Sequence, residues 1–239
     1  MVRRVPGGGS EVSARRVIRG GLWLYTRSLV SNLTGYAYWF LVSRIAGAEA
    51  LGISSATVSL AALISSVLGL GIPGALQRFL GAAIGRGNQD ELAEYFWSSA
   101  AILLLTSVLA GLALVAAGMS GIAIFGLNPN MLRYAGLLVA LSWTRVLDSL
   151  LISHLKTKQD AMAYIAGSLA KLAVGVPLVS AGRGWTGVIA GYLSSSLVTG
   201  AALLVASSGL LQTRLKVTWR GVVNLLHAGT SIWLPNTIL

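Results

Sequence analysis

Residues 95–118 have the sequence YFWSSAAILLLTSVLAGLALVAAG, and no charged side chain occurs between residues 95 and 132. An α-helix needs about 20 apolar residues to cross a hydrocarbon core about 30 Å thick. Two other stretches without charge, residues 50–77 and 184–213, also exceed that length. Working outward from these stretches, the sequence predicts an integral membrane protein built from α-helices.

The composition agrees with a membrane location. The chain of 239 residues is 55% hydrophobic and 10% charged, whereas about a quarter of the residues in a soluble domain are charged. The net charge of +11 is a feature of nucleic-acid binders. In a chain this apolar, however, cytoplasmic loops and anionic lipid headgroups explain Lys and Arg better. We therefore expect the lipid bilayer, and not nucleic acid, as a partner.

The predicted fold class is all-α, a polytopic membrane helix bundle. Six transmembrane helices and the truncated start of a seventh are expected at residues 20–43, 51–85, 95–118, 132–153, 161–180, 185–211 and from about 222. Helix breakers occupy the connectors: Gly47, Gly87-Asn88, Asn128-Pro129-Asn130 and Gly182-Arg183-Gly184. Three regions follow: a basic cytoplasmic tail (1–19), a six-helix N-terminal lobe (20–211), and a cytoplasmic connector with the truncated start of a second lobe (212–239).

The basic residues predict which side each connector faces. On one side of the expected spans lie Arg3, Arg4, Arg15, Arg16, Arg19, Arg78, Arg86, Lys156, Lys158, Arg214, Lys216 and Arg220. The other side holds only Arg44 and Arg183. By the positive-inside rule, the N-terminus is expected in the cytoplasm of a multi-pass cell-membrane protein.

Four basic residues are not assigned to either side: Arg133 lies at a helix end and can snorkel outward, whereas Arg27, Arg145 and Lys171 belong to the membrane interior and are candidate ligands for an anionic substrate. Arg27 and Asn32 lie on the polar arc of the first helix, which we expect to face protein or a hydrated cavity. For Arg27, snorkelling towards the helix end is an equally good explanation. Lys171 has no acidic residue within ten positions. A lone charged lysine in hydrocarbon is energetically costly unless it faces a hydrated cavity or binds an anion. Lys171 is therefore the best single candidate for contact with an anionic substrate.

The third basic residue, Arg145, stands three positions before Asp148 in the fourth helix. This spacing permits an intrahelical ion pair, and mutual neutralisation is a slightly better explanation of both residues than contact with a ligand.

Two glycine patterns invite a functional interpretation, but a structural one fits better. Residues 69–74, GLGIPG, match the dinucleotide fingerprint, yet about 20 apolar residues precede them and Pro73 lies inside. We therefore expect a break in the second membrane helix. Gly187 and Gly191 have the G-x-x-x-G spacing that allows two helices to approach closely.

Residues 41–52, LVSRIAGAEALG, and 68–79, LGLGIPGALQRF, resemble the opening of the polysaccharide-export flippases of the multidrug/oligosaccharidyl-lipid/polysaccharide exporter superfamily. The resemblance implies two lobes of six or seven helices around a cavity that opens alternately to each side. It implies flipping of a lipid-linked glycan, with Arg27, Arg145 and Lys171 contacting the pyrophosphate or sugar. Arg44 and Arg78 are expected at the outer and inner cavity entrances.

The chain has only one such lobe, and residues 225–235 resemble the start of a second. Because alternating access needs two bodies, we expect transport only with a second lobe or a second copy.

Three alternatives remain, of which the first belongs to the same superfamily and the second to another class. A multidrug cation exporter is expected to carry unpaired acids in its N-lobe, and Asp148 is the only acid inside an expected span. An enzyme acting on lipid phosphates would need an Asp or His cluster, but Asp90, Glu91, Glu94 and Asp160 are expected in scattered loops. The sequence therefore predicts neither catalysis nor a cofactor or metal. A non-transporting remnant or assembly subunit is the third alternative.

Overall fold

A computed structural model describes residues 8–121, 128–211 and 215–238. Every regular element in these ranges is helical, and they contain no strand, so the all-α prediction is confirmed. Residues 1–7 of the expected tail, with Arg3 and Arg4, lie outside the described residues, as does Arg214. Residues 8–19 are part of the first helix.

Helix α1 (Gly8–Gly69) contains a sharp change of direction at Gly47, whose φ of 78° and ψ of 179° are essentially restricted to glycine. The expected first and second helices are therefore two arms that meet at this residue. The second arm ends at Gly69, and α2 (Ile72–Arg86) follows after Leu70 and Gly71, both with positive φ. The break expected at residues 69–74 is confirmed, and Pro73 lies in the first turn of α2.

The remaining helices are α3 (Gln89–Met119), α4 (Pro129–Ala140), α5 (Arg145–Ser153), α6 (Thr157–Leu178), α7 (Gly184–Ser207) and α8 (Trp219–Ile238). A 3₁₀ turn (Ser142–Thr144) separates α4 from α5, so the expected fourth helix is interrupted. A π-helical segment (Val179–Arg183) joins α6 to α7 through Gly182, whose φ is positive.

Two helices begin earlier than expected, which moves acidic residues from loops into helices. Helix α3 begins at Gln89 because Asn88 caps it, accepting a bond from the Glu91 backbone N–H at 3.2 Å. Helix α6 begins at Thr157 and includes Asp160 in its first turn. The prediction that Asp160 lies in a loop is wrong, because a negative charge is favourable in the first turn of a helix.

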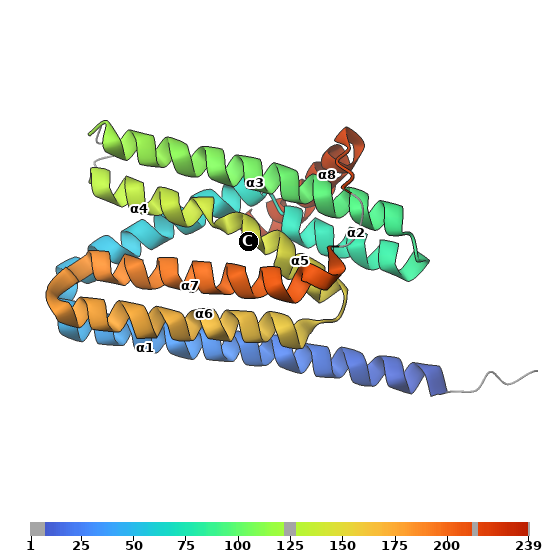
Figure 1. Ribbon diagram of the computed structural model, residues 1–239, viewed down its shortest axis with the longest axis horizontal. Helices are drawn as coiled ribbons and strands as arrows, with labels where there is room; N and C mark the ends of the chain where they lie inside the picture. Colours follow the sequence, from blue (N-terminus) through green and yellow to red (C-terminus); the bar gives the residue numbers. More distant parts are fainter. Residues whose placement is uncertain (1–7, 122–127, 212–214, 239) are drawn as a thin grey trace, which may run out of the picture.

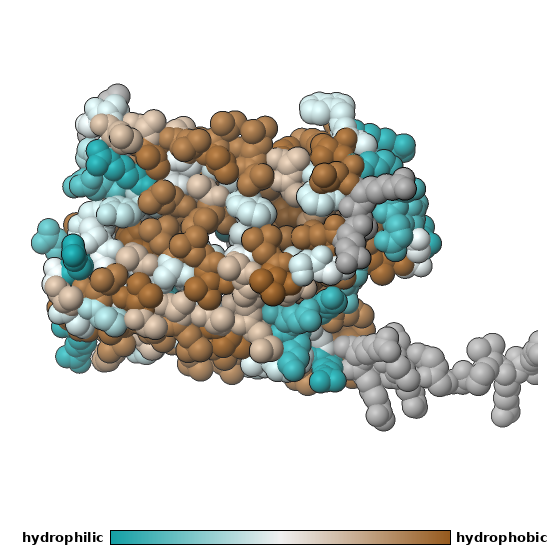
Figure 2. Space-filling view, viewed as in Figure 1, coloured by the Kyte–Doolittle hydropathy of each residue, from teal (hydrophilic) through white to brown (hydrophobic). Residues whose placement is uncertain are grey.

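Within the described residues, four stretches are long and apolar enough to cross a membrane: Val17–Gly69, Gln89–Met119, Pro129–Ser153 and Thr157–Leu210. The first and last, with 53 and 54 residues, would each be about 80 Å long if straight. Each instead reverses direction, the first at Gly47 and the last at Gly182. The two arms of α1 diverge from the turn at Gly47, whereas α6 and α7 run side by side (Figure 1). Figure 2 shows an apolar belt over the middle of the visible face and polar surface at both ends.

Close helix packing occurs where glycines face one another. A Cβ on Gly191 of α7 would lie 2.9 Å from Gly175 Cα of α6, and one on Gly187 would lie 3.0 Å from the backbone of Leu178. The close approach expected from Gly187 and Gly191 is therefore confirmed. In the same way, a Cβ on Gly111 of α3 would lie 2.7 Å from the Gly136 carbonyl oxygen of α4.

Helix α8 packs against α2 and α3, and its approach is fixed by the preceding residues. Glu94 of α3 accepts a 2.7 Å bond from the Thr218 hydroxyl, and its other oxygen lies 3.3 Å from Lys216 Nζ. Leu225 of α8 is fully buried in the main apolar cluster, with residues of α2, α3 and α5 to α7.

Candidate functional site

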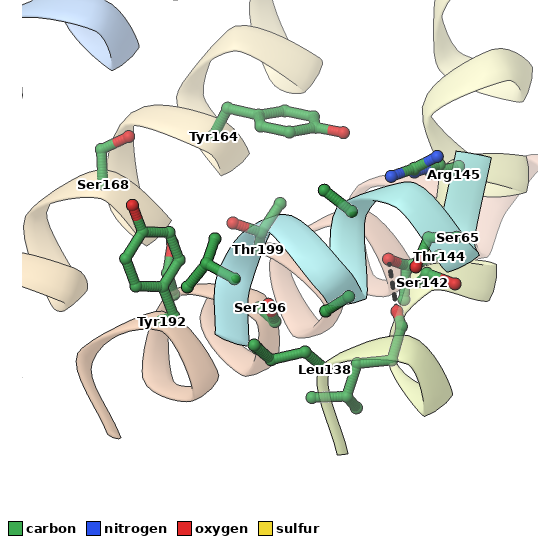
Figure 3. Close-up of a pocket in the computed structure, with 15 residues that line it drawn as sticks. Ser65, Leu138, Ser142, Thr144, Arg145, Tyr164, Ser168, Tyr192, Ser196 and Thr199 are labelled. Carbon is green, nitrogen blue, oxygen red and sulfur yellow. Dashed lines mark hydrogen bonds between the residues drawn. The ribbon is translucent and has the colours of Figure 1, made fainter. Parts of the chain in front are cut away.

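A cavity of about 280 Å³ lies between the second arm of α1 and helices α4 to α7. Figure 3 shows side chains from these helices converging on it, and a hollow is visible between α4 and α7 in Figure 2. Its lining is rich in hydroxyl groups: Ser65, Ser142, Thr144, Tyr164, Ser168, Tyr192, Ser195, Ser196 and Thr199. Hydroxyl groups can donate and accept hydrogen bonds, so this lining suits a solvated or sugar-bearing occupant.

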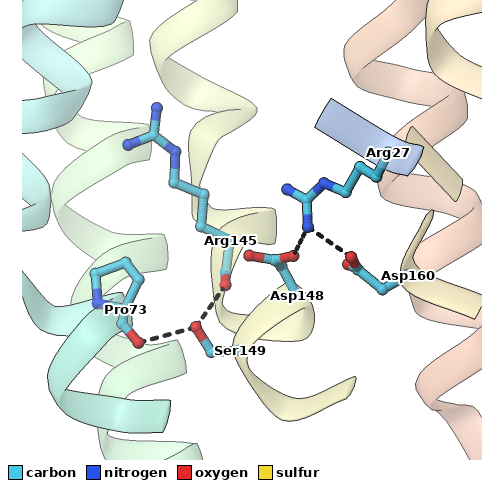
Figure 4. Close-up of polar contacts among 6 residues, drawn as sticks. All are labelled: Arg27, Pro73, Arg145, Asp148, Ser149 and Asp160. Atoms are coloured by element: carbon cyan, nitrogen blue, oxygen red, sulfur yellow. Dashed lines mark hydrogen bonds and ion pairs between the residues drawn. The ribbon is translucent and has the colours of Figure 1, made fainter. Parts of the chain in front are cut away.

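Arg145 is the one charged residue among the described residues that line this cavity. It opens α5, directly after the 3₁₀ turn, and its side chain is exposed. The carboxylates in the described part of the chain lie more than 4.0 Å from its guanidinium. Figure 4 shows that the guanidinium points away from Asp148 and Asp160. Arg145 is thus available to an anion in the cavity.

Lys171 of α6 lies behind the cavity wall, in an aromatic setting. Its ammonium nitrogen is 4.9 Å from the ring centroid of Tyr192 and 5.5 Å from that of Tyr38. Only 8% of the residue is exposed, and the described residues place no carboxylate within 4.0 Å of it. Two ring faces attract a cation but leave its charge uncompensated, and one of these rings, that of Tyr192, lines the cavity.

Arg27 behaves differently from the expectation that it contacts substrate. Its Nη1 donates to Asp148 of α5 at 2.7 Å and to Asp160 of α6 at 2.5 Å, as Figure 4 shows. The guanidinium carbon also lies 3.4 Å from the ring centroid of Tyr164, whose ring lines the cavity. Arg27 therefore connects α1, α5 and α6, and its guanidinium is already paired with two carboxylates.

The same contacts correct the predicted Arg145–Asp148 pair. Asp148 is bound by Arg27, and the described residues contain no ion pair between Arg145 and Asp148. Arg145 and Asp148 lie in the same helix α5 at the predicted i, i+3 spacing, but Asp148 is already paired with Arg27 and the guanidinium of Arg145 points away from it (Figure 4). Ser149, in the next turn, donates to the carbonyl oxygens of Arg145 and Pro73 and so ties α5 to α2.

The other candidate residues lie outside the cavity lining. Asn32 is exposed on the first arm of α1, and Arg78 is exposed on α2. Arg44 is exposed close to the Gly47 turn, with its guanidinium carbon 5.4 Å from the ring centroid of Phe40. The structure therefore brings only Arg145 into the cavity and Lys171 beside it.

Sequence reasoning missed the aromatic and hydroxyl residues that build the site. Tyr164 and Tyr192 contact Arg27 and Lys171 from elements far away in the chain. The run Ser194-Ser195-Ser196 in an otherwise apolar helix was an available signal, because hydroxyl groups in hydrocarbon need partners. Ser195 and Ser196 line the cavity, and Ser194 donates to the Ala170 carbonyl oxygen of α6.

The arrangement of helices defines the class of protein. It is similar to a solved structure described as a MOP superfamily transporter from Pyrococcus furiosus, with a TM-score of 0.69 and 18% sequence identity. The match covers 93% of this chain and 52% of that one, so the chain spans about half the length of the transporter. The fold is thus that of one half of a MOP transporter.

The family follows from the sequence comparison. Residues 17–230 match the family model described as polysaccharide biosynthesis protein. The chain belongs to this family, in agreement with its resemblance to the polysaccharide-export flippases. Among curated proteins, no match was found.

Proposed function

We propose that this chain forms one lobe of a transporter that flips a lipid-linked oligosaccharide or polysaccharide precursor across the cytoplasmic membrane. The observation that carries the proposal is the cavity lined by hydroxyl groups and by Arg145, with no carboxylate in its described lining. Hydroxyl groups suit a glycan, and a cation suits the pyrophosphate that links it to its lipid. The prenyl chain would stay in the bilayer.

Arg145 and Lys171 are the proposed contacts to the pyrophosphate. Arg145 reaches the anion directly, because its guanidinium lines the cavity without a carboxylate partner. Lys171 would reach it after a displacement of Tyr192, whose ring lines the cavity and has its centroid 4.9 Å from the ammonium nitrogen. Arg27 is bound to two carboxylates, so its proposed role is to hold α1, α5 and α6 together and not to contact substrate.

The proposed topology has six crossings and a cytoplasmic N-terminus. The two arms of α1 and the helices that follow run between two ends of the bundle (Figure 1). One end carries Arg19, Arg86, Lys156, Lys158 and Lys216. The other carries Arg44 and Arg183 near the turns at Gly47 and Gly182, and Arg133, which donates to the Gly118 carbonyl oxygen near the end of α3. This asymmetry supports placing the first end in the cytoplasm. A second lobe or a second copy would complete the cavity for alternating access.

A multidrug cation exporter is the rival within the superfamily. Asp148 of α5 and Asp160 of α6 are bound by Arg27, and no acidic residue of the described chain lines the cavity. For the Pyrococcus furiosus transporter, reverse polarity of the binding pocket was taken to suggest a different function. Here the charge in the lining is positive, which favours an anionic substrate over a cation.

Replacing Arg145 or Lys171 with Met is expected to slow flipping about tenfold or more, because a hydrogen bond to a charged group is worth about 1.5–3 kcal/mol. The measurement is the initial rate at which a fluorescent polyprenyl-diphosphate glycan changes leaflet in proteoliposomes. The protein tested is the transport-competent assembly that contains this lobe.

The matched control is Arg86→Met, which removes an exposed cation outside the cavity and should leave the rate within about twofold. Full transport by both cavity variants, or export of organic cations in place of the glycan lipid, would overturn the proposal.

A further inference from the structure

A second cavity, of about 320 Å³, lies where the start of α1 passes the turn between α5 and α6. Three of its lining residues are basic: Arg19, Lys156 and Lys158. No acidic residue is among those that line it in the described part of the chain. This cavity is separate from the hydroxyl-lined one and shares none of its residues.

The three cations have no carboxylate within 4.0 Å among the described residues. Other basic residues at the same end of the bundle are neutralised: Arg86 by Glu91 at 2.5 Å and Lys216 by Glu94 at 3.3 Å. Asp160, only two positions after Lys158, binds Arg27 instead. The cavity thus brings together three cations that no carboxylate of the described residues neutralises.

Neutral donors face the same space. Thr157 lines the cavity and is 4% exposed, yet no hydrogen bond among the described residues uses its hydroxyl. It is also the first residue of α6, a helix of 22 residues whose N-terminus has no side-chain cap. The backbone N–H groups of Gln159 and Asp160 donate to the Lys156 carbonyl oxygen, so those of Thr157 and Lys158 are the ones that add donors and a partial positive charge to the three cations.

Trp23 indicates the level of the bilayer at which the cavity lies. It is half-buried in the lining, and Lys158 Nζ lies 5.8 Å from its ring centroid. Tryptophan is enriched at the level of lipid headgroups, where one part of the ring is in hydrocarbon and the N–H is in contact with water. Figure 2 shows the transition from the apolar belt to polar surface at this end of α1 and α6.

We propose that this cavity binds the phosphate group of an anionic membrane lipid, with Lys156, Lys158 and Arg19 as its cations and the start of α6 as its neutral donors. A basic pocket between helices at headgroup depth is suited to such a phosphate. The acyl or prenyl chain would lie against the neighbouring helices. The site does not depend on the cargo proposed for the hydroxyl-lined cavity.

The test is thermal unfolding of the delipidated chain in neutral detergent, titrated with short-chain lipids. Dioctanoyl phosphatidylglycerol is expected to raise the unfolding temperature in a saturable way, because a ligand that binds only the folded state stabilises it. In the Lys156→Gln/Lys158→Gln variant, half of this rise should need about 30-fold more lipid, since each lysine contributes about a fivefold gain in affinity.

Two comparisons identify the phosphate source and the need for a lipid tail. A half-maximal concentration for farnesyl diphosphate below that for phosphatidylglycerol would assign the site to prenyl diphosphates, and the reverse to bilayer phospholipid. Each result supports the proposal if the two lysines are needed. Equal stabilisation by inorganic pyrophosphate, or by zwitterionic dioctanoyl phosphatidylcholine, would overturn it.

The matched control is Arg86→Gln/Arg220→Gln, which removes the same charge from exposed residues at the same end and outside the cavity. It should change the half-maximal lipid concentration by less than about threefold. A change as large as that of the lysine variant would mean that net charge, and no site, attracts the lipid. Because lipid binding is measured without transport, this result stands whether or not the chain flips a glycan.

Discussion

Replacing Arg27 with Met is expected to lower the free energy of unfolding by about 3–5 kcal/mol, the range for breaking one side of a buried ion pair. Arg27 is the partner of both Asp148 and Asp160, whose side chains are 14% and 0% exposed. Without the guanidinium, two carboxylates would remain close together in an apolar bundle. Asp160 Oδ1 already has no hydrogen-bond partner among the described residues. The measurement is unfolding of the purified chain in mild detergent, followed by heat or denaturant.

Two further variants show whether charge is the cause. Arg44→Met removes an exposed arginine from the same helix and should cost less than about 1 kcal/mol. Adding Asp148→Asn and Asp160→Asn to Arg27→Met removes the orphaned charges at nearly constant volume and should restore at least half of the loss. An Arg27→Met chain as stable as its parent, or a triple variant no more stable than the single one, would contradict this assignment.

Replacing Gly191 with Leu is the second change with a large expected effect, a loss of more than about 3 kcal/mol. Its Cβ would lie 2.9 Å from Gly175 Cα and 3.0 Å from the Lys171 carbonyl oxygen, and it would also overlap the Tyr38 hydroxyl. Backbone atoms of α6 cannot move aside as a flexible side chain can. Helices α6 and α7 would therefore separate, and Tyr38 would lose its 2.8 Å bond to the Val188 carbonyl oxygen.

The matched control is Gly52→Leu on the second arm of α1, where an added Cβ meets no atom within 4 Å. Leucine has a higher helix propensity than glycine, so this change should be neutral or slightly stabilising. The readouts are the unfolding midpoint and the fraction of monodisperse protein on size exclusion. Equal behaviour of the two variants would show that the close crossing at Gly191 is unimportant.

The sequence indicated the helix crossing at Gly191 better than it indicated the ion pairs of Arg27. The spacing of Gly187 and Gly191 predicted a close helix approach, although not that Gly175 would be opposite or that Tyr38 would fill the crossing. For Arg27, the sequence indicated an interior position and a choice between snorkelling and substrate contact. The structure adds what the sequence did not indicate, which is that the partners of Arg27 are Asp148 of α5 and Asp160 of α6.

Residues that are neighbours in the chain determined the helical architecture. A stretch such as 95–118 is helical and apolar whatever packs beside it, because hydrocarbon requires backbone hydrogen bonds within the segment. The breaks at Gly47, Gly71 and Gly182 likewise follow from positive φ angles that glycine adopts without a Cβ clash. Local chemistry was sufficient for these features, and the sequence by itself contained them.

Only the tertiary structure decided which charges are compensated. Arg27 meets Asp148 and Asp160 across 121 and 133 positions of sequence, whereas the pairing predicted for Arg145 used a neighbour three positions away. The energy of a charge in an apolar bundle depends on the groups within a few ångströms of it in space. Helical periodicity gives the face on which Arg27, Arg145 and Lys171 lie, but the packing of α1 against α5 and α6 chose the partners of Arg27 and left the other two cations without a carboxylate.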